Sequence, residues 1–245
     1  MENNKKILGL VLAVLVIILI ALLISKSRSN DASNAQNNGT GTTTGAGVSA
    51  RAPSLDRQLV IPKEYSKIIK SKIEAGVQSA ISKIKSDPDN IDNWFNLALW
   101  YKMANDYLGA EEIWLYVSKI NPENRTAQSN LGDLYKNSLI DYAKAEAAWL
   151  RVVAIDPTYI DAYNELYLLY RYNISEKTAE ASKILMTGIE KTKSPTLMYQ
   201  LSEYYGSIPN KPLAIEWYNK TKTAAKSIGD TKLMKSVDEA LSKLK

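Results

Sequence analysis

The sequence predicts an all-α protein, a helix-turn-helix repeat solenoid with an N-terminal single transmembrane helix. Three observations support this prediction. Residues 7–24 form an uninterrupted apolar run, a Gly/Thr/Asn-rich stretch follows it, and residues 91–226 repeat one apolar pattern every 34 or 35 positions. Self-similarity at such a fixed period is typical of arrays of helix pairs. The chain of 245 residues is long enough for one folded domain with additional segments.

Residues 7–25 are expected to cross a membrane as a signal anchor that contacts the lipid bilayer. The run ILGLVLAVLVIILIALLI contains no charged or hydrogen-bonding side chain. At about 1.5 Å per residue it extends roughly 27 Å, close to the hydrocarbon thickness of a bilayer. A cleaved signal peptide is the alternative, but the nearest small-residue site, at Ala35, lies eleven residues beyond Ile24. We therefore expect residues 1–6 to be a short tail before an uncleaved helix.

The segment after the apolar run is expected to be a flexible low-complexity linker, residues 26–53. Its central part has one charge, one branched aliphatic side chain and no aromatic residue, so it cannot bury a core. Basic residues are balanced across the apolar run, with Lys5 and Lys6 before it and Lys26 and Arg28 after it. The short N-terminal tail resembles the first part of a signal sequence. We therefore expect a single-pass membrane protein whose folded domain is extracytoplasmic.

Two sets of residues mark two helices in each repeat. The first set has a leucine followed four residues later by a tyrosine: Leu97 and Tyr101, Leu131 and Tyr135, Leu166 and Tyr170, Leu201 and Tyr205. The second set has a small residue followed at the same spacing by an aromatic one: Ala110 and Trp114, Ala145 and Trp149, Ala214 and Tyr218. Residues four apart share one helical face. Pro122 and Pro157 end the first two units.

This pattern resembles the tetratricopeptide repeat (TPR) family. The first unit reads Trp94, Leu97, Ala98, Tyr101, Ala110, Trp114 and Pro122, and the second keeps Leu131, Gly132, Tyr135, Ala145, Trp149 and Pro157. In the third unit Glu180 occupies the small-residue position, with Ala179 and Ala181 beside it, which leaves the register of the second helix open. The resemblance predicts four TPR-like repeats at about 91–124, 125–159, 160–194 and 195–226.

Helical patterns also flank the repeats. Residues 54–90 are expected to form a leading helix or an atypical half repeat, because Ile69, Ile73, Ala80 and Ile84 recur at helical spacing. Residues 227–245 are expected to form a C-terminal capping helix with one apolar and one charged face. Repeat arrays require such elements to cover their open ends.

The TPR resemblance implies that a protein or peptide partner binds in a concave groove built from the first helices. The side chains expected to line this partner-binding groove are Asp92, Phe95, Leu99, Lys102, Ser129, Asp133, Lys136, Asn164, Leu168, Arg171, Tyr199 and Glu203. Four of them are apolar or aromatic, which favours a partly apolar ligand. The alternative is that these side chains only contact their neighbours, or a C-terminal helix folded into the groove.

Residue content excludes several kinds of chemistry. The chain has no His and no Cys, so Ser-His-Asp triads, Cys nucleophiles, disulfides and zinc sites built from these ligands cannot form. Adjacent acids such as Glu111 and Glu112 point in different directions on a helix, unlike a catalytic carboxylate pair. The expected groove mixes acids and bases without a basic stripe. We therefore expect no enzyme activity, no cofactor, no metal and no nucleic-acid partner.

The favoured function is a membrane-tethered scaffold or adaptor that binds a polypeptide in the groove of a TPR superhelix. The alternative is a self-associating structural protein, a homo-oligomer, in which exposed Trp100 and Trp217 seal the contact between copies. A carboxylate-based enzyme is a distant third interpretation, because it would need a site made from acidic side chains on a helical scaffold.

Overall fold

A computed structural model describes residues 51–244, and all regular secondary structure within that range is helical. The prediction of an all-α fold is therefore confirmed for this part of the chain. The expected tail 1–6, the transmembrane helix 7–25 and linker residues 26–50 lie outside the described residues. Within residues 51–244, no helix combines the length and the apolar character needed to span a bilayer.

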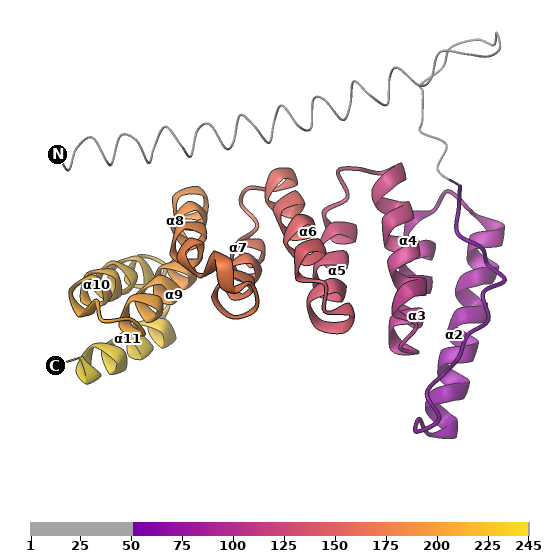
Figure 1. Cartoon of the computed structure of the whole chain (residues 1–245), viewed down its shortest axis with the longest axis horizontal. Helices are drawn as coiled ribbons and strands as arrows, with labels where there is room; N and C mark the ends of the chain where they lie inside the picture. The colour runs from indigo at the N-terminus through magenta and orange to yellow at the C-terminus, as the bar shows by residue number, and fades with distance from the viewer. Residues whose placement is uncertain (1–50, 245) are drawn as a thin grey trace, which may run out of the picture. The chain divides into compact units, whose positions relative to one another are not determined.

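Four helix pairs stand one after another, with single helices at both ends (Figure 1). The leading helix is α2 (Lys67–Ser86) and the closing helix is α11 (Thr231–Lys243). The first helices of the pairs are α3 (Ile91–Met103), α5 (Arg125–Leu134), α7 (Ile160–Leu168) and α9 (Pro195–Gly206). The second helices are α4 (Tyr107–Ile120), α6 (Tyr142–Ile155), α8 (Ala181–Thr192) and α10 (Lys211–Ser227). Each second helix packs on its partner, and those of the first three pairs also pack on the first helix of the next pair. The result is a TPR-like helical solenoid.

Most of these helices begin at a polar side chain that accepts a hydrogen bond from a backbone N–H of the first turn. The capping residues are Ser66, Asn90, Asp106, Asn124, Asp141, Ser194, Asn210 and Asp230. Such a cap satisfies a donor that has no partner inside the helix, and its loss typically costs about 1 kcal/mol. Polar residues between the apolar patterns therefore determine where these eight helices start.

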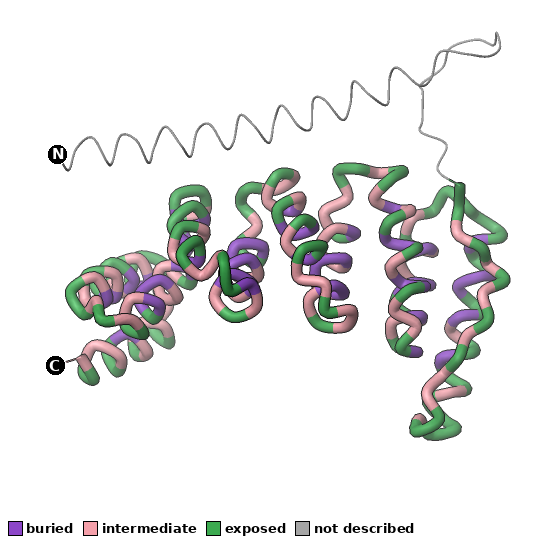
Figure 2. Tube along the Cα trace, viewed as in Figure 1, coloured by how far each residue is buried: buried purple, intermediate pink, exposed green. Residues whose placement is uncertain are grey.

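The buried residues of α2 to α9 form one core, and those of α10 and α11 form a second, smaller one (Figure 2). Leu97, Leu131, Leu166 and Leu201 are all buried, as are Ala110, Ala145 and Ala214. Trp114 is fully buried, and Trp149 is 5% exposed. Burying side chains of this size contributes about 1.5–3 kcal/mol each before entropy is subtracted. Packing between helices, more than helix propensity, therefore holds the array together.

The third repeat differs from the others at the start of its second helix. A 3₁₀-helix, η3 (Ser175–Glu180), precedes α8. Ala181 is buried and Leu185 follows it on the same helical face, whereas Glu180 and Ala179 are exposed. Ala181 therefore takes the small-residue position, which resolves the register that the sequence left open. Two single π-helical turns, η1 (Tyr135–Leu139) and η2 (Leu169–Asn173), extend α5 and α7.

Residues 51–66 are not helical, and we call them the N-terminal arm. Between residues 53 and 61 exposure alternates strictly. The half-buried positions are Pro53, Leu55, Arg57, Leu59 and Ile61, and the exposed positions are Ser54, Asp56, Gln58 and Val60. This alternation is typical of an extended segment with one face packed against a surface. The region 54–90 is therefore an extended arm followed by the helix α2.

Trp100 corrects one expectation from the sequence. It is half-buried rather than exposed, because Gly76 of α2 lies directly against its indole ring. A Cβ atom at residue 76 would lie 2.2 Å from Cε2 of Trp100. Trp217 is also half-buried. The expectation that both rings are exposed for a contact between copies is therefore wrong, although Trp217 still lines an open groove.

Candidate functional site

The residues expected to bind a partner all lie on the first helices of the pairs or on their π-helical extensions. We call the surface formed by these side chains and their neighbours on the same elements the inner face. Asp92, Phe95, Leu99 and Lys102 are on α3; Ser129 and Asp133 are on α5, with Lys136 in η1; Asn164 and Leu168 are on α7, with Arg171 in η2; Tyr199 and Glu203 are on α9. The repeat therefore places them in four successive rows, one for each pair.

Polar side chains of the inner face are paired from one row to the next. The contacts join Lys102 to Asp133, Lys136 to Glu165, Gln200 to Asn164, and Arg171 to Ser207. The Lys136 Nζ lies 2.6 Å from a Glu165 oxygen, and Arg171 donates to the Ser207 hydroxyl at 2.8 Å. Half-exposed ion pairs contribute little to stability. They do neutralise one another, so a ligand meets a polar surface with few unpaired charges.

An apolar stripe lies on α3 beside these pairs. Phe95, Leu99 and Met103 are spaced four residues apart and so share one helical face. Leu99 and Met103 are each 48% exposed, and Phe95 is half-buried. Phe95 and Leu99 were among the predicted groove residues; Met103 was not, although the spacing of four residues indicates it. Leu168, by contrast, packs against the core, and Asp92 is exposed.

The fourth row is partly covered by the chain itself. The Tyr218 hydroxyl donates to Glu203, and the Tyr199 ring meets the Tyr218 ring edge-on with centroids 5.9 Å apart. Tyr199 and Glu203 share a cavity of about 390 Å³ with Glu239 and other residues of α11. Burial, and then the hydrogen bond to Glu203, raises the pKa of Tyr218. The alternative stated above, in which the groove residues contact a C-terminal helix of the same chain, therefore applies to this fourth row.

The second and third repeats share a hydrogen-bonded network that joins successive pairs. The Tyr135 hydroxyl donates to Glu111 at 2.7 Å, and Lys144 Nζ lies 3.2 Å from the same carboxylate oxygen. Burial, and then this hydrogen bond, raises the pKa of Tyr135. The same arrangement recurs in the next repeat with Tyr170, Glu146 and Lys177. Glu111 therefore belongs to a structural network, which argues against a catalytic role.

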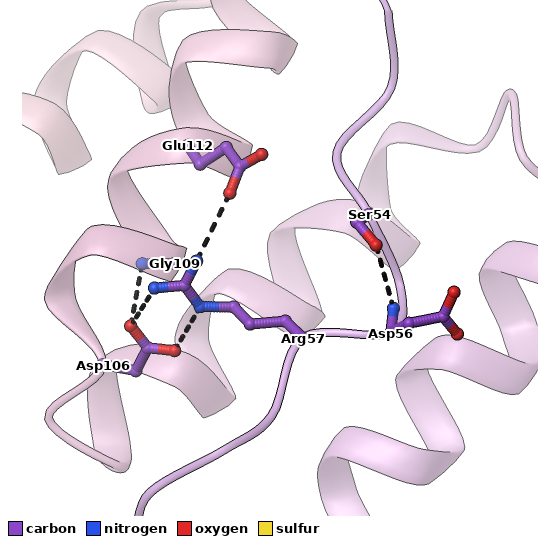
Figure 3. A network of polar contacts seen from close by, with 6 residues as sticks. All are labelled: Ser54, Asp56, Arg57, Asp106, Gly109 and Glu112. Carbon is purple, nitrogen blue, oxygen red and sulfur yellow. Dashed lines mark hydrogen bonds and ion pairs between the residues drawn. The ribbon is translucent and has the colours of Figure 1, made fainter.

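In the first repeat the positive charge comes from the arm, whereas in the second repeat it comes from Lys144 of the second helix. Gly109 stands where Lys144 stands 35 residues later. Arg57 approaches this glycine and binds Asp106 with two hydrogen bonds, Nε to Oδ2 at 2.5 Å and Nη2 to Oδ1 at 2.7 Å (Figure 3). Its Nη1 also lies 3.5 Å from Glu112. Bidentate arginine–carboxylate pairs are among the stronger polar contacts in proteins. Arg57 thus fastens the arm to α4.

Asp106 has two roles at this contact. It caps α4 by accepting the Gly109 N–H at 3.0 Å, and it receives the Arg57 guanidinium. Burial disfavours its charged form, but the hydrogen bonds from Arg57 and Gly109 outweigh burial and hold the pKa of Asp106 below its usual value. A Cβ at residue 109 would lie 2.7 Å from Arg57 Nε, so the contact needs glycine here. Neither Arg57 nor Asp106 was among the site residues predicted from the sequence.

Among residues 51–244, no cluster of three or more acidic side chains could hold a metal ion. Glu112, one of the acids considered above, points toward Arg57 in Figure 3. Asp106 and Glu112 therefore both take part in the contact with the arm.

Two crystal structures of MamA support the fold. No protein-family model matches the sequence, and no curated protein matches it. Among solved structures, a crystal structure of MamA matches with 19% identity and a TM-score of 0.50, covering 68% of this chain and 99% of that one. A second MamA structure matches with 18% identity and a TM-score of 0.51, covering 67% and 89%. A thermophilic TPR protein from Thermus thermophilus matches with 16% identity and a TM-score of 0.46, covering 71% and 98%.

Proposed function

Because the chain folds as a TPR-like solenoid, we propose that it is a scaffold that binds a polypeptide partner along its inner face, tethered to a membrane through residues 7–25. The observation that carries this proposal is the apolar stripe of Phe95, Leu99 and Met103 beside paired polar residues. Apolar side chains that stay partly exposed in one row are typical of surfaces that another molecule covers.

The chemistry of the inner face defines the kind of partner. Side chains spaced four residues apart on α3 match an amphipathic helix or an extended segment that presents apolar groups to them. The neighbouring Lys102–Asp133 pair supplies polar contacts at the edge without a strong charge preference. An apolar centre with a polar rim is the usual composition of a protein interface. A nucleic acid would need a row of unpaired cations instead.

Crosslinking in native membranes with the full chain tests the partner site. The double variant Leu99→Ser and Met103→Ser changes the stripe. Leu150→Ser with Met186→Ser is a matched control, since these side chains are 41% and 48% exposed on α6 and α8. The stripe variant should lose a specific crosslinked polypeptide that the control retains. The same crosslinks in both variants would refute the inner-face site.

The tether and the oligomeric state need separate measurements. The full chain should stay with membranes after alkaline extraction, and a variant lacking residues 7–25 should be released. Protease should reach the folded domain only from the extracytoplasmic side of sealed vesicles. The self-associating alternative predicts a mass that rises with concentration. If the stripe variant abolished that rise, the inner face would be a contact between copies.

A further inference from the structure

Three grooves on the outer side of the array share one construction. Each lies between two successive second helices, with α2 counted as the first of these, and above the first helix between them. The α2–α4 groove holds the arm. The α4–α6 groove is a cavity of about 510 Å³ that includes Leu115, Gln128 and Ala148. The α8–α10 groove is a cavity of about 720 Å³ that includes Ile189, Met198 and Trp217.

The repeat register shows that these grooves are equivalent. Gln128 and Met198 each stand three residues before the repeated leucine of their helix. Ala148 and Trp217 each stand three residues after the repeated alanine. The same positions therefore line both open cavities. The segment that fills the α2–α4 groove therefore indicates what kind of segment an open groove can bind.

The filled groove holds an extended segment with a simple pattern. Leu55 and Leu59 of the arm line a cavity together with Val77 and Ile81 of α2. Arg57, between the two leucines, reaches across to Asp106 and Glu112 of the next second helix. The occupant thus has two aliphatic side chains with an arginine between them, at alternate positions on one face.

The α8–α10 groove keeps part of the arginine-binding chemistry. Glu216 stands two residues after Ala214, as Glu112 stands two residues after Ala110. Glu216 is 52% exposed and pairs with Lys220 at 2.6 Å within one helix. Lys220 Nζ also lies 4.3 Å from the centre of the Trp217 ring. Exposed contacts of both kinds are weak, so an incoming arginine can displace Lys220 from Glu216 and from the ring. The other open groove has no acid at this position, because Ala147 stands two residues after Ala145.

From this equivalence we infer that the α8–α10 groove is a second binding site, which takes an extended segment of a partner polypeptide with the pattern aliphatic-x-Arg-x-aliphatic. The aliphatic side chains pack on Ile189, Met198 and Trp217, and the arginine pairs with Glu216. None of the residues that line this site belongs to the inner face, so it does not depend on the function proposed above.

A peptide with the sequence of residues 51–62 carries this pattern and serves as the probe. Labelled peptide is titrated with the full chain in detergent, and binding is followed by fluorescence anisotropy. Saturable binding is expected, and Trp217→Ala should weaken it at least about tenfold, as for a central aromatic side chain of an interface. Leu115→Ala, in the α4–α6 groove, is the matched control and should leave it unchanged. No saturable binding would overturn the inference.

A charge exchange keeps the test decisive if Trp217→Ala disturbs folding. Glu216→Lys changes an exposed residue, so the chain should still fold. It should abolish binding of the native peptide, and a peptide carrying R57E should bind this variant again. If Glu216→Lys leaves the affinity unchanged and Asp106→Asn changes it, the peptide binds by displacing the arm from its own groove. That result would refute the α8–α10 site. Self-association of the chain that Trp217→Ala abolishes would assign the groove to a second copy and overturn the inference of a different partner.

Discussion

Gly132 allows a direct test of the packing between the helices of the second pair. It lies inside α5, where replacing glycine by alanine normally stabilises a helix by about 1 kcal/mol. Here a Cβ would lie 2.6 Å from Cε2 and Nε1 of Trp149, so the indole would have to move by roughly 0.8 Å to reach ordinary contact. Trp149 is only 5% exposed and cannot move freely. Overpacking of a closed site costs about 1–3 kcal/mol.

Gly132→Ala should therefore destabilise the chain by about 1 kcal/mol net, which opposes the helix-propensity effect. Gly206 is the control, because a Cβ there meets only Ala214 at 4.0 Å. Gly206→Ala should be neutral or slightly stabilising. Urea unfolding of the full chain in detergent, followed by circular dichroism, measures both midpoints. A Gly132→Ala midpoint at or above that of the unchanged chain would refute the close approach of α5 and α6.

Three further predictions use other contacts. Trp114→Ala removes a fully buried side chain and should lower the free energy of unfolding by about 3–5 kcal/mol. Lys102→Ala removes one partner of a partly exposed ion pair and should lower it by under about 0.5 kcal/mol. Equal urea midpoints for the two variants would contradict this. The pKa of Asp106 is lower in the folded chain than its usual value of 3.8, so its contribution to stability is complete above that value and is lost as the pH falls below it. The urea midpoint should therefore fall between about pH 5 and about pH 2, and Asp106→Asn should make this fall smaller. Glu111→Gln weakens the acceptor shared by Tyr135 and Lys144, so the tyrosine pKa should fall toward its usual value; a phenolate absorbance titration that stays unchanged would contradict the network.

The helix pairs could be predicted because their signal lies in the chain at fixed spacing. The repeated leucine is buried in all four pairs, and the tyrosine four residues later is buried in the first three. The register of α8 could not be predicted in this way. Ala179, Glu180 and Ala181 are adjacent, and a 3₁₀-helix before α8 shifts the buried position by one residue. Only packing against the neighbouring helices decides which alanine is buried.

The partner-binding rows were predicted by position, but their pairing was not. Lys102 and Asp133 are 31 residues apart, and their contact depends on how one pair stacks on the next. The arm was missed because residues 54–66 have no helical period and its anchor, Asp106, lies 49 residues from Arg57. Two weak signals were present: the alternation around Leu55 and Leu59, and a glycine at 109 where the next repeat has lysine.

The two ends of the array are covered in different ways, and the cover at the last pair leaves the α8–α10 groove open. At the first pair, Val77 stands 34 residues before Glu111, so α2 offers no acceptor and the buried Tyr101 hydroxyl has no hydrogen-bond partner. The arm covers this side and brings Arg57 to α4. At the last pair, Val237 of α11 packs with Tyr218 and Tyr199, on the inner-face side, whereas Trp217 belongs to the main core. A closing helix on one side cannot cover the other. The α8–α10 groove therefore keeps an apolar lining that the chain's own described residues do not fill.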